Sequence, residues 1–343
     1  MPTHDGPDRF INHPGPGAHE WWYFDAISDD GRDALVIVWY AGLPFDPSYG
    51  VATLRHLRNP DRHPAPHALD HSAIGISWYR DGKTMAYGLN GHRRGAFQHE
   101  AEPFAVTVGE SRVECDGDGY RLIVATSAVN GRTPIRAELR FCPSAETIPF
   151  ERDLGGPEAP HLWILAAPDC RVEGRVGFGG TTLAFQGRGY HDHNAGAEEM
   201  SLAMRRWEWG RVHHGPFTEI YYDCEPHRGE PQSLWITCRD GRPETIREDA
   251  EFLGDRRDRT VFGMGHDRSL LVDSTEGRLV RQVRSRVDSG PFYLRWTADY
   301  TIRGSSQEAP EVGMGFAELL DTRNMNRPWF NWMIPYRLKW PRA

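Results

Sequence analysis

The middle of the chain carries five consecutive side chains that can exchange protons or hydrogen bonds, in the string Tyr190-His191-Asp192-His193-Asn194. If this segment is extended, alternation places Tyr190, Asp192 and Asn194 on one face and the two histidines on the other. An apolar surrounding would raise the pKa of Asp192, so that the carboxylic acid could donate a proton near pH 7. Asp192 is therefore the candidate acid, with Tyr190 beside it.

A second segment offers an imidazole and an indole at strand spacing. In His161-Leu162-Trp163-Ile164, an extended chain turns His161 and Trp163 to the same face. Across a pocket from the first segment, Trp163 and Tyr190 would stabilise a cation over their rings. Structural roles are the alternatives, namely a core histidine at 161 and a core ring at 163.

Local turn chemistry is the competing interpretation of Asp192 and Asn194. Both follow Gly187 and Gly189, and short polar side chains near glycines often bond to the neighbouring backbone. For Asn194 this is the preferred expectation. For Asp192 the catalytic and the turn interpretations remain open.

His191 and His193 also resemble half of a metal site. A protein zinc or non-haem iron site needs three ligands, and the nearby candidates are Glu198, His213 and His214, at no diagnostic spacing. The Gly-Arg-Gly run at 187–189 completes no dinucleotide- or phosphate-binding loop. We expect neither a metal nor a cofactor.

Two aromatic clusters predict the walls of an apolar pocket. They are His19-Glu20-Trp21-Trp22-Tyr23-Phe24 and Trp207-Glu208-Trp209-Gly210. Strand alternation places His19, Trp21 and Tyr23 on one face and Glu20, Trp22 and Phe24 on the other, and it places Trp207 and Trp209 on the same face. A purely structural role in a barrel wall is the alternative for most of these rings. The candidate substrate-binding residues are Trp21, Tyr23, Trp207 and Trp209.

Composition limits the function classes. The chain has 343 residues, a formal charge of −8 and 12 Trp, which indicates a soluble, pocket-forming protein and excludes a general nucleic-acid binder. Five cysteines without CxxC spacing, and an N-terminus without a basic start and apolar run, favour the cytoplasm. No apolar run is long enough to span a bilayer.

The C-terminal segment Trp329–Tyr336 is strongly aromatic. Docking into the core is the preferred expectation. Contact with lipid, helped by Arg337, Lys339 and Arg342, is the alternative, and it would make the protein peripheral to the inner membrane.

Short apolar runs separated by Asp-Gly and Asn-Gly turns predict an all-β fold, with Ala195–Arg205 and Gly315–Asp321 as the best helix candidates. The length predicts two antiparallel β-barrel or sandwich halves, an N-terminal domain over 1–180 and a C-terminal domain over 181–343. The boundary is expected between 143 and 198. Pro143–Pro160 is expected to be a linker or a loop over a pocket mouth.

The strings that begin at His19, Gly189 and Trp207 resemble the carotenoid 1,2-hydratase (hydroxyneurosporene synthase) family of the lipocalin-like superfamily. The resemblance implies two lipocalin-like halves and cofactor-free addition of water to the terminal 1,2 double bond of an acyclic carotene. The family's catalytic His-x-Trp and Tyr-x-Asp pairs coincide with His161, Trp163, Tyr190 and Asp192. In the mechanism that the resemblance implies, His161 positions the water that adds to the cation. Many members of the superfamily carry Trp after the His-Asp-His-Asn string, where this chain has Ala195, which leaves the carotenoid or other isoprenoid substrate open.

Two other functions compete with a hydratase. A cofactor-free cyclase or Diels–Alderase-like isomerase would use the same fold and pocket. A non-catalytic lipocalin-like carrier would bind an apolar ligand and release it unchanged.

Overall fold

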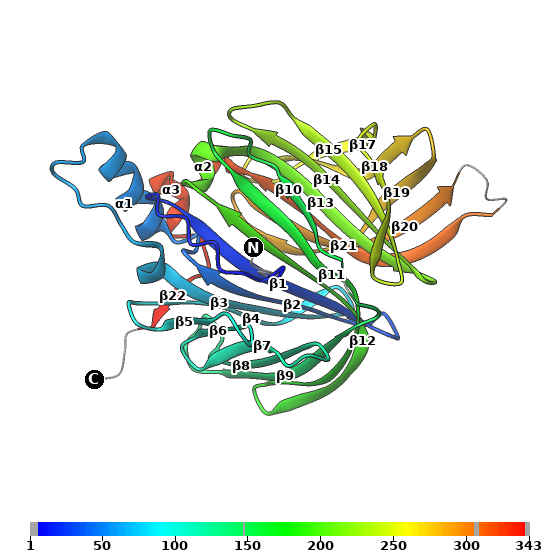
Figure 1. Ribbon diagram of the computed structural model, residues 1–343, viewed down its shortest axis with the longest axis horizontal. Helices are drawn as coiled ribbons and strands as arrows, with labels where there is room; N and C mark the ends of the chain where they lie inside the picture. Colours follow the sequence, from blue (N-terminus) through cyan, green and yellow to red (C-terminus); the bar gives the residue numbers. More distant parts are fainter. Residues whose placement is uncertain (1–5, 147, 305–308, 340–343) are drawn as a thin grey trace.

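The computed structural model describes residues 6–146, 148–304 and 309–339, and most of this chain forms antiparallel strands (Figure 1). The strands form two curled sheets that pack against each other through a shared apolar layer. The predicted all-β fold with two antiparallel halves is therefore confirmed.

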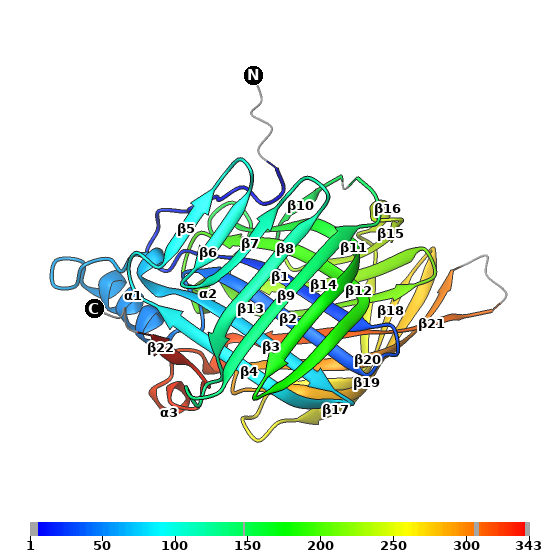
Figure 2. The ribbon, with the colours of Figure 1, turned by 90° about the horizontal axis from the view of Figure 1, so that it is seen from below.

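The first sheet contains thirteen strands of the described chain in the order β22-β4-β3-β2-β1-β12-β11-β9-β8-β7-β6-β5, with β10 paired to β11. It curls until β6 and β8 contact β2 and β4 (Figure 2). Its strands are β1 (His19–Ser28), β2 (Asp33–Ala41), β3 (Ser72–Arg80), β4 (Lys83–His92), β5 (Phe97–Glu100), β6 (Ala105–Val108), β7 (Ser111–Cys115), β8 (Tyr120–Ser127), β9 (Pro134–Pro143), β10 (Phe150–Asp153), β11 (His161–Phe178), β12 (Thr181–Gly196) and β22 (Arg337–Lys339).

The second sheet contains nine strands of the described residues in the order β16-β15-β14-β13-β21-β20-β19-β18-β17. They are β13 (Met204–His214), β14 (Phe217–Pro226), β15 (Gln232–Arg239), β16 (Arg242–Arg247), β17 (Glu251–Arg259), β18 (Gly265–Ser274), β19 (Gly277–Ser289), β20 (Tyr293–Gly304) and β21 (Glu311–Asp321). The helical segments are short: α1 (Pro47–Arg58), α2 (Met200–Ala203), α3 (Pro328–Asn331) and the 3₁₀ turns Ala68–His71 and Thr322–Asn324.

Asp-Gly turns join neighbouring strands where the sequence predicts hairpins. Asp81 and Gly82 connect β3 to β4 with φ of 50° and 73°, and Asp240 and Gly241 connect β15 to β16 with φ of 49° and 77°. Two successive residues with positive φ match the right-handed twist of the flanking strands.

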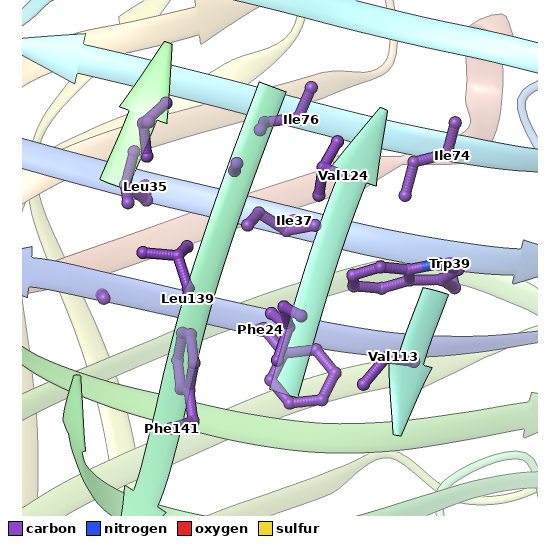
Figure 3. Packing of buried hydrophobic residues seen from close by; sticks show 14 of the residues in the cluster. Phe24, Leu35, Ile37, Trp39, Ile74, Ile76, Val113, Val124, Leu139 and Phe141 are labelled. Atoms are coloured by element: carbon purple, nitrogen blue, oxygen red, sulfur yellow. The ribbon is translucent and has the colours of Figure 1, made fainter. Parts of the chain in front are cut away.

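Alternate side chains of β1 belong to two different hydrophobic cores. Trp22 and Phe24 pack inside the curl of the first sheet, where Figure 3 shows Phe24 among Trp39 and Phe141. Trp21 and Tyr23 point the other way, into the apolar layer between the two sheets. The strand thus contributes to both cores, which explains why it is apolar on both faces.

The two aromatic clusters of the sequence meet in the layer between the sheets. Trp21 on β1 lies 6.2 Å from Trp207 on β13, and Tyr23 lies 5.7 Å from Trp209, measured between ring centroids. Beside them, the fully buried Arg211 donates to Asp25 and links β13 to β1.

One helix prediction is wrong, and the other holds only in part. Gly315–Asp321 lies within strand β21, and of Ala195–Arg205 only Met200–Ala203 is helical. Phe316, Leu319 and Leu320 are buried on both faces of β21, so their spacing imitates the period of a helix. The segment 143–160 is also more than a linker, because it contains β10, which pairs with the following strand β11.

The chain passes from the first sheet to the second between Gly196 and Met204, and its last described strand, β22, lies in the first sheet again. Residue 180 lies in the turn between β11 and β12, within the first sheet. The division into domains 1–180 and 181–343 stays a prediction.

Candidate active site

Strand pairing brings the predicted site residues together. β12 lies between β1 and β11, and Asp192 is opposite Tyr23 on β1 and Leu165 on β11. On β11, Trp163 is opposite Asn194. The register therefore places residues from three adjacent strands around one carboxyl group.

Asp192 is buried and receives three hydrogen bonds from side chains. Trp163 Nε1 and Tyr190 Oη both donate to Oδ2, over 3.0 Å and 2.7 Å. Asn194 Nδ2 donates to Oδ1 over 3.0 Å. Among the described residues Oδ1 thus has one donor, which leaves room on that oxygen for a proton.

Burial raises the pKa of Asp192 to about 7, because the charged form loses its hydration. The hydrogen bonds from Trp163 and Tyr190 lower the pKa and offset part of this effect. Around neutral pH a large fraction of Asp192 is therefore a protonated, fixed acid.

The carboxamide of Asn194 does not bond to the local backbone as expected. It holds Asp192 instead, so the turn interpretation fails for both residues. Both lie inside β12, which continues as an extended strand through this segment.

His161 lies beside the side chains that surround Asp192 and does not bond to Asp192 itself. Its ring is 5.5 Å from Trp21 and 6.0 Å from Trp207, and neither ring nitrogen has a hydrogen-bond partner among the described residues. Burial lowers the pKa of His161 to about 4, and the nearby Asn194 side chain, which is not aligned for a hydrogen bond, offsets this in part. The imidazole is neutral at pH 7.

His191 and His193 lie on the opposite face of β12, as alternation predicts. His191 pairs with Asp8 over 2.8 Å and stacks on Phe24, and His193 pairs with Glu20 over 2.7 Å. The described residues contain no group of three His, Cys, Asp or Glu side chains placed to hold a metal ion. The pairs with Asp8 and Glu20 give the two histidines a structural role in the first sheet.

Asp192 faces a small cavity of about 30 Å³ between the two sheets. The walls of this cavity include all four candidate substrate-binding residues. The full lining is Trp21, Tyr23, Asp192, Asn194, Trp207, Trp209, Tyr222 and Glu318.

A larger cavity of about 330 Å³ adjoins the small one and shares Trp21, Tyr23, Trp207 and Glu318 with it. Its other walls are mainly apolar and aromatic, and it extends to Phe45, Phe292, Ile334 and Pro335. Asp192 thus lines the smaller cavity, and the four shared side chains separate it from the larger, mainly apolar one.

The sequence analysis missed Tyr222 and Glu318. Tyr222 lies on β14, and only the packing of the second sheet against the first brings its ring to the cavity that Asp192 lines. Glu318 lies in the segment predicted to be helical, so its position opposite Trp209 on β13 was hidden.

A family model described as carotenoid hydratase CrtC matches residues 37–343. The acyclic carotenoid 1,2-hydratase of Thiocapsa roseopersicina is 32% identical over 335 residues, which cover 97% of this chain and 75% of that protein. The hydroxyneurosporene dehydrogenase of Chlorobaculum tepidum is 29% identical over 324 residues, covering 89% and 83%.

Solved structures share the fold at low sequence identity. A putative AttH from Nitrosomonas europaea aligns with a TM-score of 0.61 and 14% identity over 91% of this chain and 96% of its own. Kievitone hydratase from Nectria haematococca aligns with a TM-score of 0.58 and 11% identity over 93% and 95%. These alignments confirm the predicted lipocalin-like architecture. The family model and the Thiocapsa relative show that the chain belongs to the carotenoid hydratase CrtC family.

Proposed function

We propose that the protein is a hydro-lyase that adds water to the terminal 1,2 double bond of an acyclic carotenoid of the lycopene or neurosporene type. Membership of the CrtC family and the name of the Thiocapsa relative support this reaction. The observation that carries the proposal is Asp192, a buried acid with a pKa of about 7 at the end of an aromatic cavity.

The reaction begins with proton transfer to carbon. Asp192 gives its proton to C2 of the terminal alkene, and the pair of π electrons forms the new C–H bond. C1 then becomes a tertiary cation, and the oxygen of water bonds to it. Loss of one proton from that oxygen gives the tertiary alcohol, so H and OH have been added across the double bond.

Trp163 and Tyr190 orient the acid in this proposal. Their N–H and O–H groups point at Oδ2 of Asp192, which directs the proton on Oδ1 toward the cavity. The cation is stabilised by the rings that line the small cavity, above all Trp209 and Tyr222, because the face of an aromatic ring attracts positive charge. This moves the expected cation-binding role from Trp163 and Tyr190 to their neighbours.

His161 remains a candidate for holding water. Its neutral ring contacts Trp21 and Trp207, two residues of the cavity wall, but His161 itself does not belong to that wall. A role in shaping the positions of these two indoles is better supported by its contacts.

We also propose that the substrate enters from a lipid surface. Trp329 and Trp332 are 81% and 79% exposed, and Trp332 is two residues from Ile334, which lines the larger cavity. Residues 322–343 include five basic and no acidic side chains, a charge that suits anionic lipid headgroups. Ile334 does pack against the core, so the expected docking of Trp329–Tyr336 holds only for part of the segment.

No helix of the described chain has the length and apolar character that crossing a membrane requires. Arg337 and Lys339 belong to β22, and Arg342 lies outside the described residues.

Incubation with lycopene or neurosporene in ¹⁸O-labelled water tests the reaction. An alcohol that carries the label at C1 is the expected product. An isomerised hydrocarbon without label would identify a cyclase or isomerase, and unchanged ligand recovered from the complex would identify a carrier. Either of these results would contradict the proposed function.

A further inference from the structure

A second carboxylate faces the cavity from the sheet opposite Asp192. Glu318 lies on β21, is 8% exposed, and lines both the small and the large cavity. It is opposite Trp209 on β13 and Arg295 on β20. The proposed acid and Glu318 therefore approach the substrate site from two different sheets.

Two donors fix the Glu318 carboxylate in place. Tyr23 Oη donates to Oε1 over 3.0 Å, and Arg295 Nε donates to the same oxygen over 2.7 Å. Arg295 is in turn held by Asp288 over 2.8 Å and by the hydroxyl of Tyr79 over 3.0 Å. Such fixed partners suit a carboxylate that must stay in one position during a reaction.

The Glu318 carboxylate belongs to a cluster with one guanidinium and a second carboxylate. Arg295 pairs with Glu318 over 2.7 Å and with Asp288 over 2.8 Å, and the formal charge of these three side chains is −1. A salt bridge that only stabilises the fold does not need to lie beside a cavity. In this cluster, Glu318 lies on the wall of the cavity that Asp192 also lines, where the cation would form.

We propose that Glu318 accepts the proton that water loses as it adds to the cation. This inference rests on the proposed function and divides its two proton transfers between two residues. Asp192 protonates C2, the water oxygen bonds to C1, and the O–H electron pair stays on oxygen while the proton moves to Glu318. The proton then returns to the Asp192 carboxylate through water or the Tyr23 hydroxyl, which restores both groups.

Deuterium exchange separates the two transfers. In D₂O, Asp192 delivers a deuteron to C2, and without capture by water its carboxylate removes a hydron from C2 and regenerates the alkene. The variant E318Q is therefore expected to lose alcohol formation by at least about 100-fold while the recovered lycopene still gains deuterium at C2. Mass spectrometry of recovered lycopene and of the alcohol measures both.

Three further variants make the test decisive. E208Q removes another buried carboxylate, which pairs with Arg281 over 2.9 Å and does not line the cavity, and it should leave the ratio of alcohol to exchange unchanged. D192N should lose both products. E318D retains a carboxylate and should recover part of the alcohol formation. If E318Q does not fold, E318D tests the inference instead, and its ratio of alcohol to exchange should be lower than that of the wild type.

Equal loss of exchange and alcohol in E318Q would show a structural role and overturn the inference, as would alcohol formation at the wild-type rate. A wild-type protein that neither hydrates nor exchanges lycopene would overturn the proposed function itself. If the wild type forms labelled alcohol and E318Q forms it at the same rate, the role of Glu318 would be overturned while the proposed function would stand.

Discussion

The indole N–H of Trp163 on β11 donates to Oδ2 of Asp192 on β12 over 3.0 Å, inside the layer between the two sheets. This contact joins the two segments that the sequence analysis singled out separately. In this contact the polar edge of the indole, rather than its ring face, meets the carboxyl group. The first three predictions concern this group.

Asp192→Asn is expected to lower kcat by at least about 100-fold, since the amide cannot donate the proton that starts the reaction. The fold should persist, because Asn keeps an oxygen for Trp163 and Tyr190. Steady-state hydration rates and thermal unfolding measure the two effects. The matched control is Asp223→Asn, which alters another carboxyl group whose pKa burial raises but which bonds to Ser233 outside the cavity; a similar loss there would contradict the assignment.

Hydration by the wild-type protein should decline as pH rises through about 7. Asp192 must be protonated to act, and burial raises its pKa to about 7, so its active form disappears above that pH. The profile of kcat/KM against pH checks this. A rate that stays constant from pH 6 to 9 would rule out Asp192 as the acid.

Tyr190→Phe should move this alkaline decline to higher pH. The Tyr190 hydroxyl donates to Asp192 Oδ2 over 2.7 Å and thereby lowers the pKa of the acid, so its removal raises that pKa. The maximal rate should fall, because the acid loses one of its orienting contacts. The comparison is between the pH profiles of the variant and the wild type, and a shift toward lower pH would contradict the proposed hydrogen-bond role.

The side-chain directions within single strands could be predicted from the sequence. Alternation separated Asp192 from His191 and Trp21 from Trp22, because a strand has only two faces and the polar and aromatic residues repeat at every second position. The 161–163 segment was also expected to meet Asp192, but across a pocket from a facing wall. This expectation was wrong in its geometry, because β11 and β12 are neighbouring strands of one sheet.

The opposite wall of the site could not be predicted. Glu318 reaches the cavity through the pairing of β21 with β13, two segments more than a hundred residues apart. Its own strand is apolar on both faces, so the pattern of its residues suggested a helix. Local periodicity carries no information about which distant strands become neighbours.

Arg211→Met should lower the free energy of unfolding by about 3–5 kcal/mol, because it leaves the fully buried Asp25 without its partner. Urea denaturation followed by circular dichroism measures the change. The double variant Asp25→Leu/Arg211→Met removes both charges and should recover much of the stability. If the double variant is as unstable as the single one, the packing of Arg211 on Phe316 within the second sheet, rather than the ion pair with Asp25, supplies the stability.

Replacing Trp329 and Trp332 by Ala should reduce binding to vesicles that contain anionic lipid by about tenfold or more, equivalent to about 1.4 kcal/mol. The two indoles are exposed in water, and indole rings prefer the interface between headgroups and acyl chains.

Binding of the wild type should also weaken as salt is added, since basic residues of the same segment attract the anionic surface. Val312→Ser is the control, because Val312 is 72% exposed near the start of β21, and Figure 1 shows this end of the strand away from α3. Hydration of detergent-dispersed lycopene should remain near the wild-type rate in the Trp variant, while hydration of lycopene embedded in vesicles falls. Equal vesicle binding by the wild type and the Trp variant would contradict entry of the substrate from a lipid surface at this segment.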